Sequence, residues 1–485
     1  MFALLCFAAI WHGTVSDQAT HAGIGGALVS NGTLVVSTDP AGHYILPTAG
    51  PFMFVIQPAG YRVAGDANHV PQFYHRVTEG PGEANFELTK APQPDRYMAL
   101  IFTDPQPANE REVGYLDRTL SQPLAATAAQ RFQFGLTLGD VTYDRPDLYP
   151  AINASLGRMG IPWFSVNGNH DLELGIAGEG AVQSYEASFG PSTYAFYWGQ
   201  AVFIALNDVR HLGGPRYIGG LRPDQWAFFE SVLRHTSRET LVVPFFHIPL
   251  FSPDPSNAET FRYADRLRLF ALLHDHPNVL LLSGHTHYTR HVFYTKADGW
   301  NGSAPLHEAN LAAACGGFWG GPPDENGIPI ATMSDGTPPG YTELTIDGTK
   351  AQVAYRPGRH PAEDQLAVHA PRVIAPKQGY ISYYANVYDG HDGWTIEGRV
   401  DDRGWLPLKR LLGWDPTYAA AYLAQDSANR PPRTPRLPDP AICYHLWRAY
   451  LPGDLALGPH TLTVRATSPD GPVYLQSQPF TVAKP

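Results

Sequence analysis

The sequence predicts an α/β core with a small β-sandwich domain at each end. In the middle of the chain, short apolar runs alternate with amphipathic helical segments, a pattern that indicates a sheet covered by helices. Toward both ends, short segments alternate apolar and polar residues between turn signals, which is typical of β-sandwiches. A chain of 485 residues, 44% of them hydrophobic, can bury more than one core. We therefore expect three domains, at 1–92, 95–360 and 365–485.

The N-terminal domain is predicted from five short apolar segments. These segments are 27–29, 33–37, 43–46, 52–56 and 85–88. Asn31-Gly32 and Asp39-Pro40-Ala41-Gly42 are hairpin and turn signals between them. The pattern resembles the carboxypeptidase regulatory-like β-sandwich, and the proline-containing residues 91–95 are predicted to form a stiff linker to the core.

The C-terminal domain is predicted from four strand-like segments. These are 383–388, 394–400, 446–450 and 460–466. Residues 429–438 contain too much proline for a helix or a strand and are predicted to form an exposed loop. Because neither terminal domain contains a recognisable cluster of ligands, a role as scaffold or pocket wall is favoured over carbohydrate or cell-surface binding.

Five apolar runs in the core are each followed by a polar motif. The runs are 99–102, 134–138, 163–166, 241–244 and 279–282. The motifs are Thr103-Asp104-Pro105-Gln106, Leu138-Gly139-Asp140-Val141, Asn167-Gly168-Asn169-His170-Asp171, Phe246-His247-Ile248-Pro249 and Ser283-Gly284-His285-Thr286-His287. Since ligands of open α/β sheets bind beyond the carboxyl ends of the strands, these side chains are predicted to meet at one edge. Between the motifs, a hairpin is expected at 194–206 and a helix from Arg222-Pro223 onward.

The side chains in these motifs suit a metal centre. Carboxylate and amide oxygens mixed with imidazoles are typical ligands of Mn, Fe, Zn or Mg. The three cysteines, Cys6, Cys315 and Cys443, include no close pair, which excludes a zinc ribbon. Any one of these Asp, Asn or Gly residues is more often a turn residue than a ligand. All five motifs together, each after a strand, favour two metal ions.

The order of the motifs resembles that of the calcineurin-like metallophosphoesterases, in which D-x-H, GD, GNH-D/E, H and GHxH follow one another. The segments 217–221, 247–251 and 333–338 resemble one bacterial subgroup in which small β domains precede and follow the core. The resemblance covers nearly the whole chain. It implies a metallophosphoesterase-type double β-sheet sandwich flanked by helices, and an exported, extracytoplasmic protein.

The resemblance also implies a role for each matching residue. Asp140 would bridge two metal ions. Asp104, Gln106 and His287 would complete one coordination sphere, and Asn169, His247 and His285 the other. His170 would be the acid that protonates the leaving oxygen, with an acidic neighbour, Asp171 or Asp144, holding its ring. No covalent intermediate is expected in such an in-line displacement.

One position departs from the family pattern, because Gln106 stands where the family has histidine. A neutral amide oxygen is a poorer ligand for borderline metals, so this site is expected to bind more weakly, to favour a harder ion or to need another ligand. Tyr143 is a candidate for that ligand, since Gly139 to Tyr143 also resembles the GDxxY of purple acid phosphatases. Packing of Tyr143 beside the site is the favoured interpretation.

The remaining histidines have no partner motif. His211, His235, His274, His276 and His291 are expected to be surface or packing residues. His307 and Glu308 precede the Gly/aromatic segment 315–321, which is predicted either to wall a substrate pocket or to form a tight turn with buried rings.

Charge and the start of the chain limit the partners. The net charge is −11, and no basic run of five or more occurs, which disfavours nucleic acid or an anionic membrane as a partner. Residues 1–10 are apolar but too short to span a bilayer. They lack a basic start and an evident cleavage site, so they are either a clipped or misassigned export signal or a first strand. If the N-terminus is as written and not a signal, a cytoplasmic location is expected.

These observations predict metal-dependent hydrolysis of a small phosphomonoester or phosphodiester. The alternative is an exported binding or scaffold protein whose activity has weakened at Gln106. Other hydrolase and nucleotide-binding classes are disfavoured because neither a Gly-x-Ser-x-Gly elbow nor a glycine-lysine phosphate loop occurs. The substrate, the identity of the metals and the oligomeric state stay open.

Overall fold

A computed structural model describes residues 9–176, 178–251, 260–427, 429–431 and 434–485. It divides into two compact units. The first contains Met1–His285, Val292–Glu308 and Glu343–Val353, and the second contains Thr286–His291, Ala309–Thr342 and Ala354–Pro485. The predicted export segment falls, except for residues 9 and 10, outside the described residues. None of the helices within the described ranges is long and apolar enough to cross a membrane.

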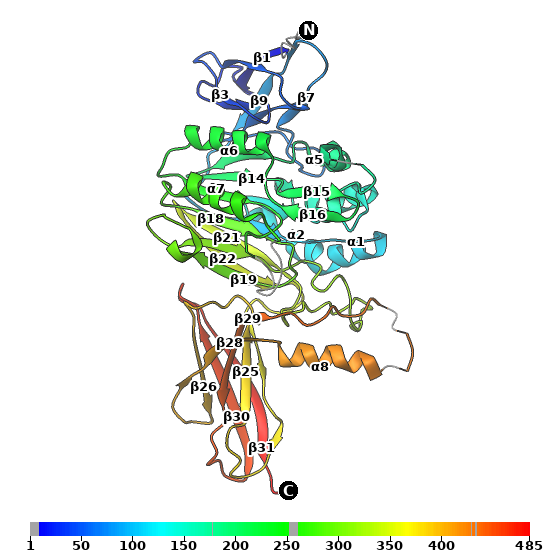
Figure 1. Ribbon diagram of the computed structural model, residues 1–485, viewed down its shortest axis with the longest axis vertical. Coiled ribbons are helices and arrows are strands. Elements are labelled where there is room, and N and C mark those ends of the chain that lie inside the picture. Colours follow the sequence, from blue (N-terminus) through cyan, green and yellow to red (C-terminus); the bar gives the residue numbers. More distant parts are fainter. Residues whose placement is uncertain (1–8, 177, 252–259, 428, 432–433) are drawn as a thin grey trace. The chain divides into compact units, whose positions relative to one another are not determined.

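The N-terminal region of the first unit consists of two small β-sheets (Figure 1). One sheet has the order β4-β1-β9-β6, with β8 paired to β1, and the other has the order β3-β2-β5-β7. The strands are β1 (Ile10–Asp17), β2 (Leu28–Ser30), β3 (Val35–Ser37), β4 (His43–Pro47), β5 (Phe52–Ile56), β6 (Tyr61–Arg62), β7 (Tyr74–Arg76), β8 (Gly82–Glu83) and β9 (Phe86–Lys90). Asn31 forms the predicted turn between β2 and β3 by accepting hydrogen bonds from the backbone of Thr33 and Leu34.

Two larger sheets form the core. Their orders are β12-β11-β10-β21-β22 and β13-β14-β17-β18-β20-β19. The strands are β10 (Arg96–Phe102), β11 (Phe134–Leu138), β12 (Trp163–Val166), β13 (Tyr194–Trp198), β14 (Ala201–Ala205), β17 (Leu241–Phe245), β18 (Leu280–Ser283), β19 (Arg290–Tyr294), β20 (Leu306–Asn310), β21 (Gly340–Asp347) and β22 (Lys350–Pro357). The five strands predicted to precede the motifs are present, and so is the hairpin that turns at Gly199-Gln200. The three strands β10, β11 and β12 are parallel, as are β14, β17 and β18.

Aromatic rings join the two core sheets. The ring of Phe134 on β11 lies 5.4 Å from that of Phe196 and 5.1 Å from that of Phe203, both on the other sheet. Phe164 on β12 stacks on Phe196 with ring centroids 3.9 Å apart. Burying such large rings is the main source of stability in a core of this kind. The predicted double-sheet α/β sandwich is confirmed.

Helices cover the sheets. They are α1 (Glu110–Leu116), α2 (Gln122–Ala125), α3 (Ala128–Arg131), α4 (Tyr149–Gly157), α5 (Gln183–Phe189), α6 (Pro223–His235) and α7 (Tyr263–Leu273). Helix α6 begins at Pro223, as predicted, and buries Trp226, Phe229 and Leu233. Its Phe228 packs 5.7 Å from Phe54 of β5, so the helix also holds the N-terminal sheets. Beside the core, β15 (Val209–Gly213) and β16 (Arg216–Gly219) form a separate hairpin.

The C-terminal part of the second unit consists of two sheets around one hydrophobic core. Their orders are β23-β25-β29-β28 and β24-β31-β30-β26-β27. The strands are β23 (Leu366–His369), β24 (Val373–Ile374), β25 (Ser382–Val387), β26 (Thr395–Val400), β27 (Leu406–Pro407), β28 (Lys409–Gly413), β29 (Cys443–Tyr450), β30 (Gly458–Thr467) and β31 (Val473–Val482). All four predicted strands are present.

A helix in this β domain was not predicted. Helix α8 (Pro416–Ala424) lies beside the two sheets in Figure 1. Asp415 caps it by accepting a 2.7 Å hydrogen bond from the backbone of Tyr418, and Pro416 occupies the first turn. An Asp-Pro pair before an alanine-rich run is a recognised helix start, so the signal was present in the sequence.

Candidate metal centre

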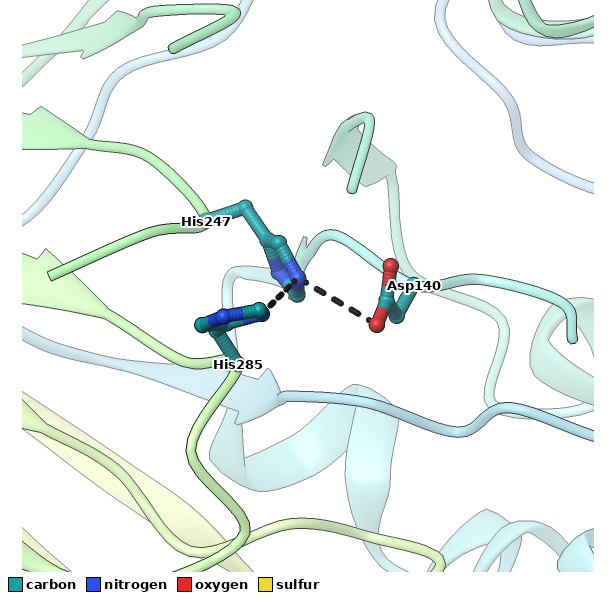
Figure 2. Close-up of side chains that lie close together, drawn as sticks. All are labelled: Asp140, His247 and His285. Carbon is teal, nitrogen blue, oxygen red and sulfur yellow. Dashed lines mark hydrogen bonds and ion pairs between the residues drawn. The ribbon is translucent and has the colours of Figure 1, made fainter. Parts of the chain in front are cut away.

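The first unit brings together predicted ligands that are far apart in the chain. Asp140 follows β11, His247 follows β17 and His285 follows β18. Figure 2 shows these three side chains pointing toward one another from separate strand ends. Within the described part of the chain, they form a group whose ligand atoms all lie within 4.8 Å of one another. The predicted convergence at the carboxyl ends of the strands is present.

The Nε2 atom of His247 is the centre of this group. It lies 3.2 Å from Asp140 Oδ2, 3.1 Å from Asn169 Oδ1 and 3.1 Å from His285 Nδ1. The other ring nitrogen of His247, Nδ1, donates to the backbone carbonyl of Leu138 at 2.9 Å, so Nε2 carries the lone pair in the neutral ring. Four atoms with lone pairs therefore converge, an arrangement that a cation stabilises.

The pKa of His247 also indicates that this group of side chains favours a positive charge. Its ring is completely buried, and burial alone would lower its pKa. The Asp140 carboxylate outweighs burial and raises the pKa of His247 to about 10. The same contact overcomes the effect of burial on Asp140, whose pKa falls well below its usual range. The pocket thus strongly favours a positive charge between these groups, and a bound metal ion would supply it.

Five predicted ligands have left-handed backbone conformations. They are Asp104 (φ 49°), Gln106 (φ 47°), Asp140 (φ 46°), His285 (φ 74°) and His287 (φ 53°). Residues other than glycine rarely adopt this region, and each costs on the order of 1–3 kcal/mol. Strain of this kind, repeated at the ends of three different strands, is a mark of a functional site.

Glycines in the motifs allow the ligands to approach one another. A Cβ atom on Gly168 would lie 2.1 Å from Asp140 Oδ1. A Cβ atom on Gly139, whose φ is 85°, would lie 2.5 Å from the Nδ1 atom of His247. Both distances are far inside van der Waals contact, so any side chain at these positions would push a ligand out of place. This explains why the GD and GN pairs contain glycine.

Asp104 and Gln106 lie against the same group. Asp104 Oδ2 accepts a 3.0 Å hydrogen bond from the backbone of His285. The amide Nε2 of Gln106 donates to Asp140 Oδ2 at 2.7 Å. Both side chains are buried. Gln106 therefore contacts the carboxylate predicted to bridge two ions, and its amide oxygen is the atom able to ligate a metal.

His287 is described within the second unit. Its Nδ1 atom donates to the carbonyl of Gly316 at 2.6 Å, and Phe318 stacks on its ring with centroids 4.1 Å apart. The hydrogen bond fixes the tautomer, so that Nε2 is the atom able to bind a metal. In the Gly/aromatic segment Trp319 is buried, as predicted for a tight turn, while Phe318 is 38% exposed and stacks on the His287 ring. The alternative role of the segment as the wall of a substrate pocket stays a prediction.

His170 has two neighbours that orient it. Its ring nitrogen Nδ1 lies 3.0 Å from Asp144 Oδ1, and the ring of Tyr143 stacks on it with centroids 4.2 Å apart. Its backbone N–H donates to Asp140 Oδ1 at 2.8 Å. Of the two acidic neighbours left open by the sequence, Asp144 is the one that contacts the His170 ring. Tyr143 takes the packing position beside it.

Asp171 has a different environment from the predicted one. Its carboxylate accepts hydrogen bonds from the backbone of Gly168 at 2.8 Å and of Val141 at 3.0 Å, and from the hydroxyl of Tyr149 at 3.0 Å. Burial, with a further contribution from Asp140, raises the pKa of Asp171 to about 7. These contacts join the loops that follow β11 and β12, which indicates a structural role for Asp171. Its predicted catalytic role stays a prediction.

Two buried carboxylates that support the site were not predicted. Asp208 accepts from the backbone of His247 at 3.2 Å and of Ile248 at 3.0 Å. Burial raises the pKa of Asp208 to about 7, against the influence of His247. Asp208 follows the apolar run of β14 as the predicted ligands follow theirs, so the same rule would have found it. No family motif marks the position of Asp208.

Glu308 on β20 is the second of these carboxylates. It is fully buried and accepts from the backbone of Leu250 and from the hydroxyl of Ser283, both at 3.0 Å. Leu250 follows His247 in the chain, and Ser283 precedes His285. Glu308 therefore joins the two loops that carry His247 and His285. Sequence alone left its role open because the partners are more than 20 residues away.

The fold and the site together define a class. A double-sheet α/β sandwich with carboxylate, amide and imidazole groups at its strand ends is the arrangement of a metal-dependent hydrolase. Three family models match the chain: calcineurin-like phosphoesterase at residues 100–289, the N-terminal domain of calcineurin-like phosphoesterase at 10–91 and the C-terminal domain at 308–474. The chain belongs to the calcineurin-like phosphoesterases and is a metallophosphoesterase.

Two of the solved structures that are similar to the chain are phosphatases of low sequence identity. A dimetal phosphatase from Danio rerio is 15% identical over 54% of this chain and 96% of its own, with a TM-score of 0.36. A purple acid phosphatase from seeds of yellow lupin (Lupinus luteus) is 13% identical over 73% of this chain and 67% of its own, with a TM-score of 0.41. A search of curated proteins found no significant match.

Proposed function

We propose that the chain is an active phosphoesterase with two metal ions, and that it acts on a small phosphomonoester or phosphodiester. The convergence of Asp140, Asn169 and His285 on the Nε2 atom of His247 carries this proposal. These four groups would hold one ion. Asp104 and Gln106 lie against the same group and are proposed as ligands of the second ion, with His287 as its third ligand from the sequence motif.

The proposed chemistry divides between the ions and the protein. Two bound ions would acidify a water molecule, neutralise the phosphoryl oxygens and stabilise the attacking and leaving oxygens. Asp140 would bridge them, which explains why its backbone is held in a strained conformation and its carboxylate accepts from both Gln106 and His170. The ligand types suit Mn, Fe, Zn or Mg and do not distinguish among these four metals.

His170 is proposed as the acid. Asp144 faces its Nδ1 atom, so the proton available for transfer lies on Nε2. The His170 side chain is 23% exposed, in contrast to the fully buried His247, and so a substrate can reach it. Protonation of the leaving oxygen by a positioned histidine accelerates such reactions on the order of 10²- to 10⁴-fold.

The second candidate function is a binding or scaffold protein weakened at Gln106. One observation favours it: the amide nitrogen of Gln106, and not its oxygen, faces Asp140. An amide turned this way would add nothing to metal binding. Rotation of the amide by half a turn would present the oxygen instead.

The deciding experiment is metal reconstitution. Protein stripped by a chelator is reloaded with Mn, Fe with Zn, or Mg, and its hydrolysis of p-nitrophenyl phosphate and bis(p-nitrophenyl) phosphate is measured along with bound metal per chain. We expect about two ions and turnover with at least one metal. A His274→Ala variant, altered on an exposed loop after α7, serves as the control and should behave as wild type. One ion bound and no turnover in folded protein would favour the scaffold.

A further inference from the structure

The β15/β16 hairpin places side chains beside the metal centre. The ring of Tyr217 on β16 lies 5.9 Å from the ring of His285, edge to face at 83°. His211 on β15 is paired directly opposite Tyr217. In an antiparallel pair, residues directly opposite each other project their side chains to the same face. The face of the hairpin that meets the ligand His285 therefore also carries His211.

His211 lines a pocket of about 230 Å³. Its walls include Leu172, Val182, Asn207, Val209, His211 and Arg222. The pocket borders the loop that carries two site residues: Leu172 comes two residues after His170, and Asn207 accepts a 3.1 Å hydrogen bond from Asn167, two residues before Asn169.

The pocket contains a buried acceptor. The Nε2 atom of His211 lies 2.8 Å from the carbonyl of Gly214 and donates its proton there, so in the neutral ring the lone pair is on Nδ1. That Nδ1 atom is buried and makes no hydrogen bond among the residues the structure describes. A buried polar atom without a partner costs about 1–3 kcal/mol, and a ligand that donates to it would remove this cost.

We propose that this pocket binds the leaving group of the substrate and that the leaving group is a small hydroxylated alcohol, one of whose hydroxyls donates to His211 Nδ1. The guanidinium of Arg222, which bonds Asp224 at 3.0 Å and 3.2 Å, adds donors on the pocket wall. A volume of about 230 Å³ is below the usual range for drug-sized ligands, and so it suits a polyol better than a nucleoside or a lipid. This inference rests on the proposed function, since it assigns the substrate class of the same site.

The test compares two esters of equal length. Glycerol phosphate and n-propyl phosphate differ only in the hydroxyls of the alcohol, and phosphate release from each is measured with metal-loaded enzyme. We expect kcat/KM for glycerol phosphate to exceed that for propyl phosphate by about tenfold, the effect of one hydrogen bond gained in a buried site. In His211→Leu the ratio should fall to near one through a loss on glycerol phosphate, with propyl phosphate and p-nitrophenyl phosphate unchanged within about twofold.

Two further variants complete the test. His211→Gln, which keeps an acceptor on the side chain, should retain part of the preference, and His274→Leu should retain all of it. An unchanged preference in His211→Leu, or no preference in wild type that hydrolyses p-nitrophenyl phosphate, would overturn the pocket assignment while the proposed function stands. Metal-loaded wild type that hydrolyses none of the three esters would overturn both.

Discussion

The two units each contain a buried cluster of histidine and aspartate, and the clusters differ in how their hydrogen bonds are satisfied. In the first unit, the single Nε2 atom of His247 lies within 3.2 Å of three polar atoms at once, Asp140 Oδ2, Asn169 Oδ1 and His285 Nδ1. In the second unit, His445 is 1% exposed, its Nδ1 atom lies 2.7 Å from Asn386 Oδ1 and its Nε2 atom lies 2.9 Å from Asp335 Oδ2. Each of its ring nitrogens therefore has a hydrogen-bond partner.

The other side chains of the second cluster also have hydrogen-bond partners. Asp335 accepts at its two oxygens from the backbone of Thr337 and Thr289, each at 2.8 Å. Asn386 donates to the carbonyl of Asp335 and to Asp415. None of the side chains in this cluster is among the described residues with left-handed backbone. The comparison teaches that a satisfied, unstrained cluster stabilises a fold, whereas a strained cluster with excess acceptors is built for a cation.

Matched aspartate substitutions give the largest expected contrast. Asp140→Asn removes the negative charge at the centre of the metal cluster, and we expect loss of bound metal and a fall in kcat/KM on the order of 10³-fold or more, equal to several kcal/mol of transition-state stabilisation. Full activity in this variant would contradict the metal assignment.

Asp335→Asn should have the opposite profile. It removes the carboxylate from its buried pair with His445, and breaking a buried pair of this kind typically costs about 3–5 kcal/mol. For a unit of this size we expect the unfolding temperature to fall by roughly 6–20 °C, with metal content and kcat/KM of the folded protein retained. Calorimetry and metal analysis of the same sample measure both. Metal loss without destabilisation would show that the two clusters have been assigned to the wrong roles.

Asp144→Asn probes the orientation of His170. The amide that replaces the carboxylate could still accept from Nδ1 but would no longer stabilise a charged ring, so we expect kcat to fall about 10- to 100-fold with metal content unchanged. Because a general acid acts only while it is protonated, the alkaline limb of the pH profile, and not only the maximal rate, should move. The matched control is Asp171→Asn, which by our assignment loosens the loops and lowers stability. A larger shift of the pH profile in Asp171→Asn would restore Asp171 as the partner of His170.

Sequence patterns predicted most of the fold because strand ends, turns and helix starts are local. The five strands before the motifs, the turn at Gly199 and the start of α6 at Pro223 all depend on residues close in the chain. The partners of Asp171, Glu308 and Asp208 could not be predicted in this way. Each bonds to backbone in a loop that is distant in sequence or has no side-chain signal of its own. Local patterns identify ligands, while the groups that hold them depend on tertiary contacts.

The smallest expected effect on stability comes from a pair of residues on the surface of the second unit. The pair consists of a histidine and an aspartate, as in the buried cluster. His460 Nδ1 lies 2.7 Å from Asp401 Oδ2, and this hydrogen bond raises the pKa of His460 and lowers that of Asp401. A raised histidine pKa stabilises the fold below about pH 6.5, and this stabilisation is lost as the pH rises through the folded value. A lowered aspartate pKa stabilises it above about pH 3.8 and is lost as the pH falls.

The two dependences overlap between about pH 4 and 6.5, so His460→Gln should lower the unfolding temperature most within that window. Because the Asp401 side chain is 41% exposed, we expect less than about 1 kcal/mol, or roughly 2–4 °C. His360→Gln, which alters an exposed pair at 3.4 Å with Asp364, is the control and should show no such maximum. If His460→Gln lowers the unfolding temperature equally at pH 5 and pH 9, then His460 stabilises the fold by packing and not by its charge. Its ring lies 5.5 Å from that of Phe480.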